Sequence, residues 1–250
     1  MSLRTDDSQI RVILLDIEGT TTPIDFVYKT LFPYARRKVE SFLREHYRDP
    51  EIQSLAAELR AQHEQDERAG LVPAAWIEET DEARLISSVG YVHWLMARDS
   101  KCTPLKTLQG KIWQQGYERG ELHGELYADV PPAFARWRRH GREICIYSSG
   151  SVLAQQLLFR STAAGDLTEY ISGFFDTRIG AKTESGSYTK IAESRGRHAS
   201  EVLFVSDAIK EIEAARVSSM QAVLCVRDSN TAQHASGQRI ITTFDQILPD

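Results

Sequence analysis

Two carboxylates follow a short apolar run near the start of the chain. The run Val12 to Leu15 leads directly into Asp16 and Glu18, with Gly19 and three threonines behind them. A carboxylate at the tip of a buried strand is held rigidly, so it can act as a nucleophile or bind a divalent cation. If the strand continued, both acids would point to the same side, and they would repel each other unless one were protonated or a metal lay between them. Either arrangement suits catalysis, although the pair taken alone is explained better as a polar turn.

Three later segments offer residues of matching chemistry. Ser148 and Ser149 follow another apolar run, where hydroxyls and free N–H groups at a helix start can bind an anion, although a plain helix cap explains them equally well. Lys182, in a polar loop, could supply a fixed positive charge, but a lone loop lysine is usually just solvated. Asp207 follows a third apolar run; together with Asp16 it could chelate magnesium, and alone it is also a plausible helix N-cap.

These residues can meet only if the elements that carry them belong to one sheet. Four apolar runs have the character of buried parallel strands: Val12 to Leu15, Ile144 to Tyr147, Val202 to Val205 and Ala222 to Val226. Helical patterns are expected at Pro131 to His140, Val152 to Phe159 and Ala208 to Val217. In a doubly wound α/β sheet the carboxyl ends of the strands face the crevice where ligands bind. The sequence therefore predicts an α/β fold with a doubly wound parallel sheet, at whose edge the polar clusters converge.

The segment from residue 25 to residue 127 has a different character. Long helical patterns with no strand-like alternation cover it: Phe26 to Tyr47, Ile52 to Ala69, Ile77 to Ala97 and Leu105 to Arg119. Thr80 begins a plausible first turn, and Thr103 followed by Pro104 is typical of a cap with proline at the first helical position. We therefore predict a core domain of residues 1–24 and 128–250, with residues 25–127 inserted as an all-helical domain.

Composition excludes several classes of protein. Apolar residues make up 42% and charged residues 26% of 250 residues, and the net charge of -5 comes without the basic face of a nucleic-acid binder. No apolar run approaches the roughly 20 residues that span a bilayer, and no signal peptide is evident, so a cytoplasmic protein is expected. The three cysteines form no CxxC, which argues against a disulfide framework or a zinc site. The P-loop motif of kinases is absent.

The order of the polar clusters resembles the four motifs of the haloacid dehalogenase-type phosphatases. These are a strand ending in DxEGT, a strand ending in Ser, a later Lys and a strand ending in an acid. The resemblance implies that Asp16 is the nucleophile that takes the phosphoryl group. It implies that Glu18 protonates the leaving oxygen and then activates water.

The same resemblance implies how the phosphate and a metal are held. Ser148 or Ser149 would bind phosphate oxygens, and Lys182 would steady the nucleophile and the phosphate. One magnesium ion per chain would be bound by Asp16, Asp207 and Glu18, the last through its backbone carbonyl. The physics agrees, because a dianionic phosphate approaches a carboxylate only when positive charge neutralises the repulsion.

A narrower resemblance covers most of the chain. It is similar to the enolase-phosphatase family of methionine salvage, the acireductone synthases, in the segments DIEGTTTPIDFVY, LFPYA, LKTLQGKIWQQGY, DVPPAF, YSSGSVLAQQLLF, FFDTRIGAKTESGSY and the VRDSN loop. The resemblance implies that the helical insert is a cap domain. It also implies that 2,3-diketo-5-methylthiopentyl-1-phosphate is enolised and then dephosphorylated to the acireductone. Ser206 to Glu211 is a looser form of the fourth motif, which assigns Glu211 no role.

The methylthio tail of such a substrate would need apolar side chains around it. Candidates are Phe26, Tyr28, Phe32, Ile112 and Trp113, although packing explains any one of them better. We expect a monomer.

Three other functions are weighed against this one. The first is another magnesium-dependent phosphatase of small metabolites from the same superfamily. The second is a receiver-type signalling domain that is phosphorylated on an aspartate. Such a domain needs an acidic pair at the tip of its first strand, whereas Asp6 and Asp7 precede the strand, and the chain is about twice the expected size. A dehalogenase is disfavoured because Glu18 and a metal site would be superfluous in it.

Overall fold

The computed structural model describes residues 7–227 and 239–248. It divides into two compact units, one of Met1–Val27 with His123–Asp250 and one of Tyr28–Leu122, which we call the core unit and the helical unit. Asp6 and the last three residues of the VRDSN loop lie outside the described residues. No helix in the described ranges is long and apolar enough to cross a membrane.

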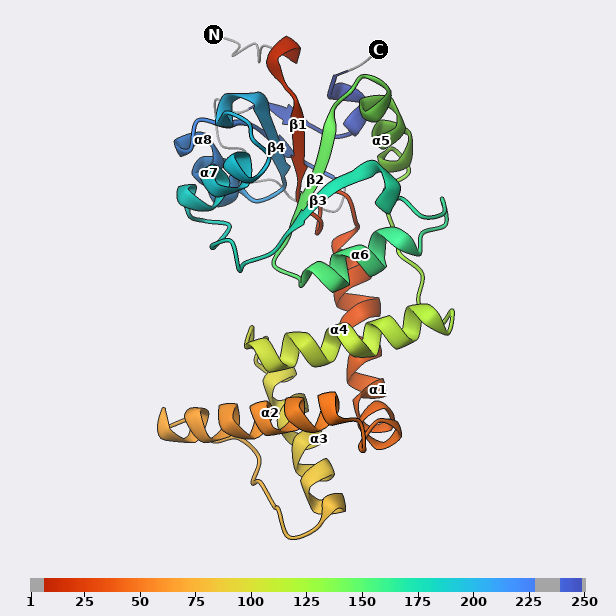
Figure 1. Cartoon of the computed structure of the whole chain (residues 1–250), viewed down its shortest axis with the longest axis vertical. Coiled ribbons are helices and arrows are strands. Elements are labelled where there is room, and N and C mark those ends of the chain that lie inside the picture. Colours follow the sequence, from red (N-terminus) through yellow and green to blue (C-terminus); the bar gives the residue numbers. More distant parts are fainter. Residues whose placement is uncertain (1–6, 228–238, 249–250) are drawn as a thin grey trace. The chain divides into compact units, whose positions relative to one another are not determined.

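A six-stranded parallel sheet forms the centre of the core unit (Figure 1). Its strands are β1 (Val12–Leu15), β2 (Glu143–Tyr147), β3 (Ile171–Phe175), β4 (Val202–Ser206), β5 (Gln221–Cys225) and β6 (Ile240–Ile241). Their order is β3-β2-β1-β4-β5-β6, and every neighbouring pair is parallel. The central strand β1 is fully buried, because it has a strand on each side and helices over both faces. The predicted α/β fold with a parallel sheet is therefore confirmed.

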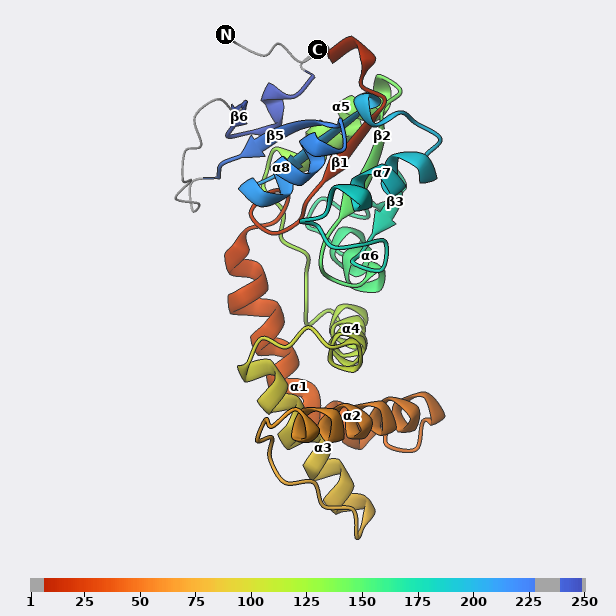
Figure 2. The same ribbon diagram turned by 90° about the vertical axis from the view of Figure 1, so that its left-hand side faces the viewer.

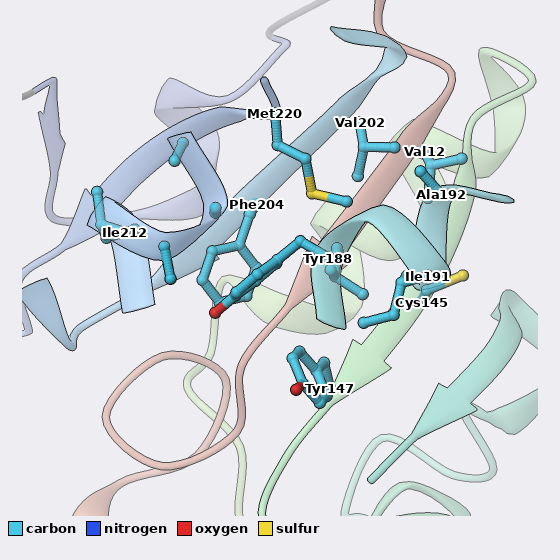
Figure 3. Close-up of a cluster of buried hydrophobic side chains, with 14 of the residues drawn as sticks. Val12, Cys145, Tyr147, Tyr188, Ile191, Ala192, Val202, Phe204, Ile212 and Met220 are labelled. Carbon is cyan, nitrogen blue, oxygen red and sulfur yellow. The ribbon is translucent and has the colours of Figure 1, made fainter. Parts of the chain in front are cut away.

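Helices cover both faces of this sheet. They are α5 (Val130–Arg139), α6 (Val152–Arg160), α7 (Ser185–Ser194) and α8 (Ile209–Val217). Figures 1 and 2 show α7 and α8 on one face and α5 on the other. Alternate strand residues such as Val12 and Phe204 pack against Tyr188 of α7 and Ile212 of α8 (Figure 3). On the α5 side, the rings of Phe134 and Phe159 join α5 to α6 with centroids 6.0 Å apart.

Four strands were predicted, and the structure adds β3 and β6. The predicted ones are runs of buried apolar residues, which is the strongest signal that a strand gives. In β3 every residue is only partly buried, and Ser172 and Gly173 interrupt its apolar pattern. Strand β6 has only two residues, which is too short for any periodicity to develop.

The helical unit contains α1 (Phe32–Glu45), α2 (Pro50–Arg68), α3 (Asp81–Ala97) and α4 (Thr103–Glu118). A short π-helix, Phe26–Leu31, leads directly into α1, so the helix predicted from Phe26 is present and takes the π form over its first turns. The start of α3 was placed too early: it begins at Asp81, and the Thr80 hydroxyl accepts a bond from the amide of Ala83, 3.1 Å away. The cap predicted for α4 was also wrong, because Cys102 is the N-cap and Thr103 lies inside the helix. Pro104 permits this, since a first-turn N–H has no partner within the helix.

Candidate active site at the ends of the parallel strands

Asp16 lies immediately beyond the carboxyl end of β1 and is only 3% exposed. Its Oδ1 is 2.5 Å from the Nζ of Lys182 and accepts a bond from the amide of Ile17 at 2.8 Å. Its Oδ2 accepts a bond from the hydroxyl of Ser206 at 3.2 Å. Both oxygens therefore have fixed donors, and the carboxylate is aimed by its surroundings. A carboxylate held in one orientation beside a cation is well placed to act as a nucleophile.

A tight turn follows Asp16, so β1 does not continue through Glu18. The amides of Thr20, Thr21 and Thr22 all donate to the carbonyl of Ile17, at 3.0 to 3.1 Å. Gly19 has φ of 72°, which a residue without a Cβ adopts without strain. The alternation argument for the two acids therefore does not apply, because it assumes a continuing strand. The turn still keeps Glu18 near the site, since its charge acts on Asp207.

Lys182 connects two carboxylates. Its Nζ lies 2.7 Å from the Oε2 of Glu211 as well as 2.5 Å from Asp16. Burial alone would lower the pKa of Lys182, but the charges of Asp16 and Glu211 outweigh that effect and raise it above its usual value. The lysine is therefore a permanent cation at the strand ends. The structure thus gives the expected loop lysine specific partners.

Two residues of this cluster were not predicted from the sequence. The hydroxyl of Ser206 lies 2.9 Å from Glu211 Oε2 and 3.2 Å from Asp16 Oδ2, so its one proton is shared between the two carboxylates. Its oxygen accepts a bond from the amide of Ala208 at 3.1 Å. Burial, and next the charge of Asp16, raise the pKa of Glu211 to about 7. The sequence carries no clear signal for either residue, because both act with Asp16 or Lys182, which lie far away along the chain.

Asp207 is not the N-cap of α8. Of the two roles expected for it, helix cap and magnesium ligand, the first is therefore wrong. The N-cap is Ala208, and the amide of Ala208 bonds to Ser206 instead. Burial is the largest cause that raises the pKa of Asp207, to about 7, followed by the charge of Asp16 and, more weakly, that of Glu18. Three carboxylates thus act on one another at this place with Lys182 as the nearby cation. Such an excess of buried negative charge favours a bound cation.

Magnesium fits this donor set. Carboxylate and carbonyl oxygens are the ligands it prefers, and it usually keeps several waters. Within the described residues, no three acidic, histidine or cysteine side chains are close enough to surround an ion by themselves. Water and a backbone carbonyl would therefore complete the coordination. Asp16 and Asp207 are the side chains that could hold the ion.

The second predicted cluster lies at the end of β2, the neighbour of β1. Because Leu15 pairs with Ile146, Asp16 is level with Tyr147, and Ser148 is one residue further. Ser148 is 1% exposed; its hydroxyl accepts a bond from the amide of Gly150 at 3.1 Å. Ser149 is exposed. The cluster therefore holds one buried and one accessible hydroxyl beside the β1 end.

The N-cap of α6 is Ser151, so neither Ser148 nor Ser149 is the cap. The Ser151 hydroxyl accepts a bond from the amide of Ala154 at 3.3 Å. Gln155, which was not singled out from the sequence, donates from Nε2 to the carbonyls of Gly150 and Phe175, at 2.9 and 2.8 Å. A buried glutamine thus ties the serine loop to the end of β3, and this role depends on a side-chain direction that spacing does not reveal.

The five apolar candidates for the substrate tail differ in exposure. Ile112 is fully buried and Phe26 and Trp113 nearly so, which is the burial of packing residues. Tyr28 is 57% exposed, and its ring packs edge-on against Phe32 with centroids 5.6 Å apart. A cavity of about 460 Å³ also lies within the helical unit, where residues such as Leu43, Trp76 and Leu85 line it. None of the predicted site residues lines that cavity.

Comparisons with known proteins place this chain in a family. Residues 10–218 match the model of haloacid dehalogenase-like hydrolases. Enolase-phosphatase E1 of Synechococcus elongatus is 48% identical over 238 residues, which cover 95% of this chain and 98% of that protein. Enolase-phosphatase E1 of Danio rerio is 44% identical, with coverage of 95% and 94%. The chain belongs to the enolase-phosphatase E1 family. The predicted family and its hydrolase chemistry are therefore confirmed.

Solved structures support the fold of this enolase-phosphatase E1 family member. The UTR4 protein of Saccharomyces cerevisiae superposes with a TM-score of 0.76 at 34% identity, covering 95% of this chain and 99% of that chain. CbbY of Rhodobacter sphaeroides, whose structure is a complex with phosphate, has a TM-score of 0.58 at 14% identity and shares the fold. Membership in an enzyme family also rules out the receiver-type alternative.

The raised pKa of Asp207 gives a prediction about stability in the absence of magnesium. An acid whose pKa is higher in the folded state stabilises the fold at low pH and loses that contribution as the pH rises from its ordinary pKa to its folded pKa. The window for Asp207 runs from 3.8 to about 7. Replacing Asp207 by Asn removes this loss, so the variant should gain stability relative to the parent protein across the window, by on the order of 2 kcal/mol.

Urea unfolding of both proteins in chelator, at several pH values across that window, measures the effect. A difference in the free energy of unfolding that does not change with pH would contradict the assignment. Because each comparison is made at one pH, titration of groups far from Asp207 cancels to first order.

Proposed function

We propose that this family member converts 2,3-diketo-5-methylthiopentyl-1-phosphate to its enol phosphate, and then to the acireductone 1,2-dihydroxy-3-keto-5-methylthiopentene and phosphate, in methionine salvage. The observation that carries the proposal is the buried contact of 2.5 Å between Asp16 and Lys182, in a chain 48% identical to an Enolase-phosphatase E1. A carboxylate so placed suits attack on a phosphate ester, because the cation offsets the repulsion between two anions.

In the phosphatase half-reaction, an Asp16 oxygen attacks the phosphorus in line with the ester bond. The bond between phosphorus and the C1 oxygen breaks, and Glu18 gives a proton to that oxygen as the acireductone leaves. An aspartyl-phosphate remains on Asp16. Glu18, now deprotonated, takes a proton from water, which attacks the phosphorus and restores the free carboxylate with release of phosphate.

Several chain groups hold the reactants in this scheme. Ser148, Ser149 and Lys182 bind the phosphate oxygens, and Lys182 also keeps Asp16 in position. Asp16, Asp207 and the carbonyl of Glu18 would hold one magnesium ion. When bound, magnesium supplies positive charge that screens the phosphate and makes the hydrogen next to the diketone more acidic. We also propose a cytoplasmic monomer in which residues 25–127 form the cap domain.

The two serines should contribute unequally to phosphate binding. Ser148 is buried and shapes the loop through Gly150, whereas Ser149 is exposed. Ser148→Ala should lower kcat/KM roughly 10-fold, chiefly through KM, since a hydrogen bond to a charged group contributes about 1.5 kcal/mol or more. Ser149→Ala, the matched control, should lose less. Steady-state kinetics of both variants measure the two losses. A larger loss of kcat/KM for Ser149→Ala would mean that Ser149, and not Ser148, contributes more to phosphate binding.

The experiment that tests the function supplies the diketone phosphate anaerobically with magnesium. Enol formation is followed by absorbance, and phosphate release is followed separately in the same samples. An enol that appears before phosphate supports the proposal. Phosphate release without any enol, or no activity beside strong turnover of ordinary sugar phosphates, would favour a different small-metabolite phosphatase of the same superfamily.

A further inference from the structure

Arg227, just beyond β5, is a buried cation far from Asp16 in the sequence and absent from the mechanism above. It is 5% exposed. Its Nε and Nη2 both donate to the carbonyl of Thr20, at 3.2 and 2.9 Å. Its Nη1 donates to Asp129 Oδ2 at 2.8 Å and to the carbonyl of Thr242 at 3.1 Å. One side chain therefore bonds to three separate segments of the core unit.

The surroundings of this guanidinium hold it in one orientation. The rings of Tyr127 and Phe244 lie with their centroids 4.3 and 4.8 Å from it. Asp129 neutralises its charge and also accepts a bond from the amide of Phe244, at 2.6 Å. A buried charge is tolerated only when it is paired and hydrogen-bonded, and both conditions are met here. The planar fork of arginine suits two bonds to one carbonyl in a way that lysine cannot match.

The carbonyl that Arg227 holds belongs to the turn that follows Asp16. Thr20 donates its amide to the carbonyl of Ile17, and the amide of Ile17 donates to the Asp16 side chain. On the other side of the same turn, the carbonyl of Thr21 accepts a bond from the amide of Tyr127 at 3.1 Å. A displacement of Thr20 would therefore move Ile17, whose amide holds the carboxylate of Asp16. It would also move Glu18, which lies between Ile17 and Thr20 in the sequence.

We propose that Arg227 is a positioning residue for the reaction, which fixes the turn of residues 17–22 and so aims Asp16 and Glu18. The inference rests on the proposed function only in taking Asp16 as the nucleophile. Arg227 acts through Thr20 and does not touch the reacting atoms. A misplacement of about 1 Å at a reacting group can cost about 100-fold in rate, so loss of this clamp should lower kcat far more than it changes KM.

The test compares Arg227→Met with Arg136→Met. Arg136 is a matched control because it is also a buried arginine, whose Nη2 donates to the carbonyls of Phe244 and Ile247 and not to the turn. We expect Arg227→Met to reduce kcat by roughly 10- to 100-fold and Arg136→Met to leave kcat within about twofold, at matched folded fractions. Arg227→Lys should recover only part of the loss, because it keeps the charge without the fork.

Kinetics are measured with a generic aryl phosphate as well as the diketone phosphate. If the parent protein turns over the aryl phosphate but not the diketone phosphate, the result counts against the proposed substrate and not against the role of Arg227. Amide exchange of residues 17–22 provides a readout without turnover, and it should speed up in Arg227→Met but not in Arg136→Met. If Arg227→Met does not fold, Arg227→Lys and Asp129→Asn are measured in the same way. Unchanged kcat together with unchanged exchange in the turn overturns the proposal.

Discussion

Replacing Asp16 by Asn is expected to abolish phosphate release while the protein stays folded. Asn has the same shape, but its amide is a poor nucleophile and cannot form the aspartyl-phosphate. The loss should be about 1,000-fold or more in kcat, as is usual when a covalent nucleophile is removed. Single-turnover assays of phosphate release, with circular dichroism as the check on folding, measure it.

Glu143→Gln is the matched control for this variant. Glu143 is a partly buried acid at the opposite end of β2, where it pairs with Arg195 at 2.5 Å and Arg197 at 2.9 Å. Replacing Glu143 should lower the stability of the fold without a comparable loss of kcat, because Glu143 lies at the amino end of β2 and the site lies at the carboxyl end. Normal magnesium-dependent turnover by Asp16→Asn would remove Asp16 from the role of nucleophile.

Replacing Lys182 by Met should have the second largest effect. The variant leaves Asp16 and Glu211 facing each other in a buried site without the cation between them. Removing one partner of a buried ion pair typically costs about 3–5 kcal/mol of stability. Catalysis should fall as well, by roughly 100-fold or more in kcat/KM, since the charge that steadies the phosphate is lost. Urea unfolding and steady-state kinetics measure the two effects separately.

The double variant Lys182→Met with Glu211→Gln distinguishes these two effects. Neutralising Glu211 removes one of the two uncompensated charges, so stability should recover in part while activity should not. Lys190→Met, at an exposed position on α7, is the control for loss of a lysine. Recovery of activity in the double variant would mean that Lys182 serves only to hold the fold.

The sheet and the main cluster could be predicted because their signals are local. The strand Val12–Leu15 is a continuous apolar run, and its predicted bounds match those of β1. Asp16, Lys182 and Asp207 each follow such an element or lie in a polar loop, and their order along the chain matched a known set of motifs. Spacing alone left every one of them with an ordinary explanation.

The supporting residues could not be predicted, because their roles depend on side-chain directions set by distant packing. Ser206 lies within a strand and points to Asp16, which is 190 positions earlier. Arg227 follows an apolar strand and gives no sign that it holds Thr20. Glu211 lies in the first turn of α8, and its partner Lys182 comes from another loop.

The hydrogen bond between the amide of Tyr127 and the carbonyl of Thr21 also bears on the modularity of the chain. It closes a loop that contains the whole helical unit, Tyr28–Leu122, and both of its ends lie in the core unit. The entropy cost of closing a flexible loop grows only with the logarithm of its length, by about 0.6 kcal/mol for each doubling. The helical unit is therefore a long loop between Thr21 and Tyr127, which the core unit already holds together, and its length adds little to the entropy cost of folding the core unit. Inserts of very different size could therefore be exchanged at this position with little effect on the stability of the sheet.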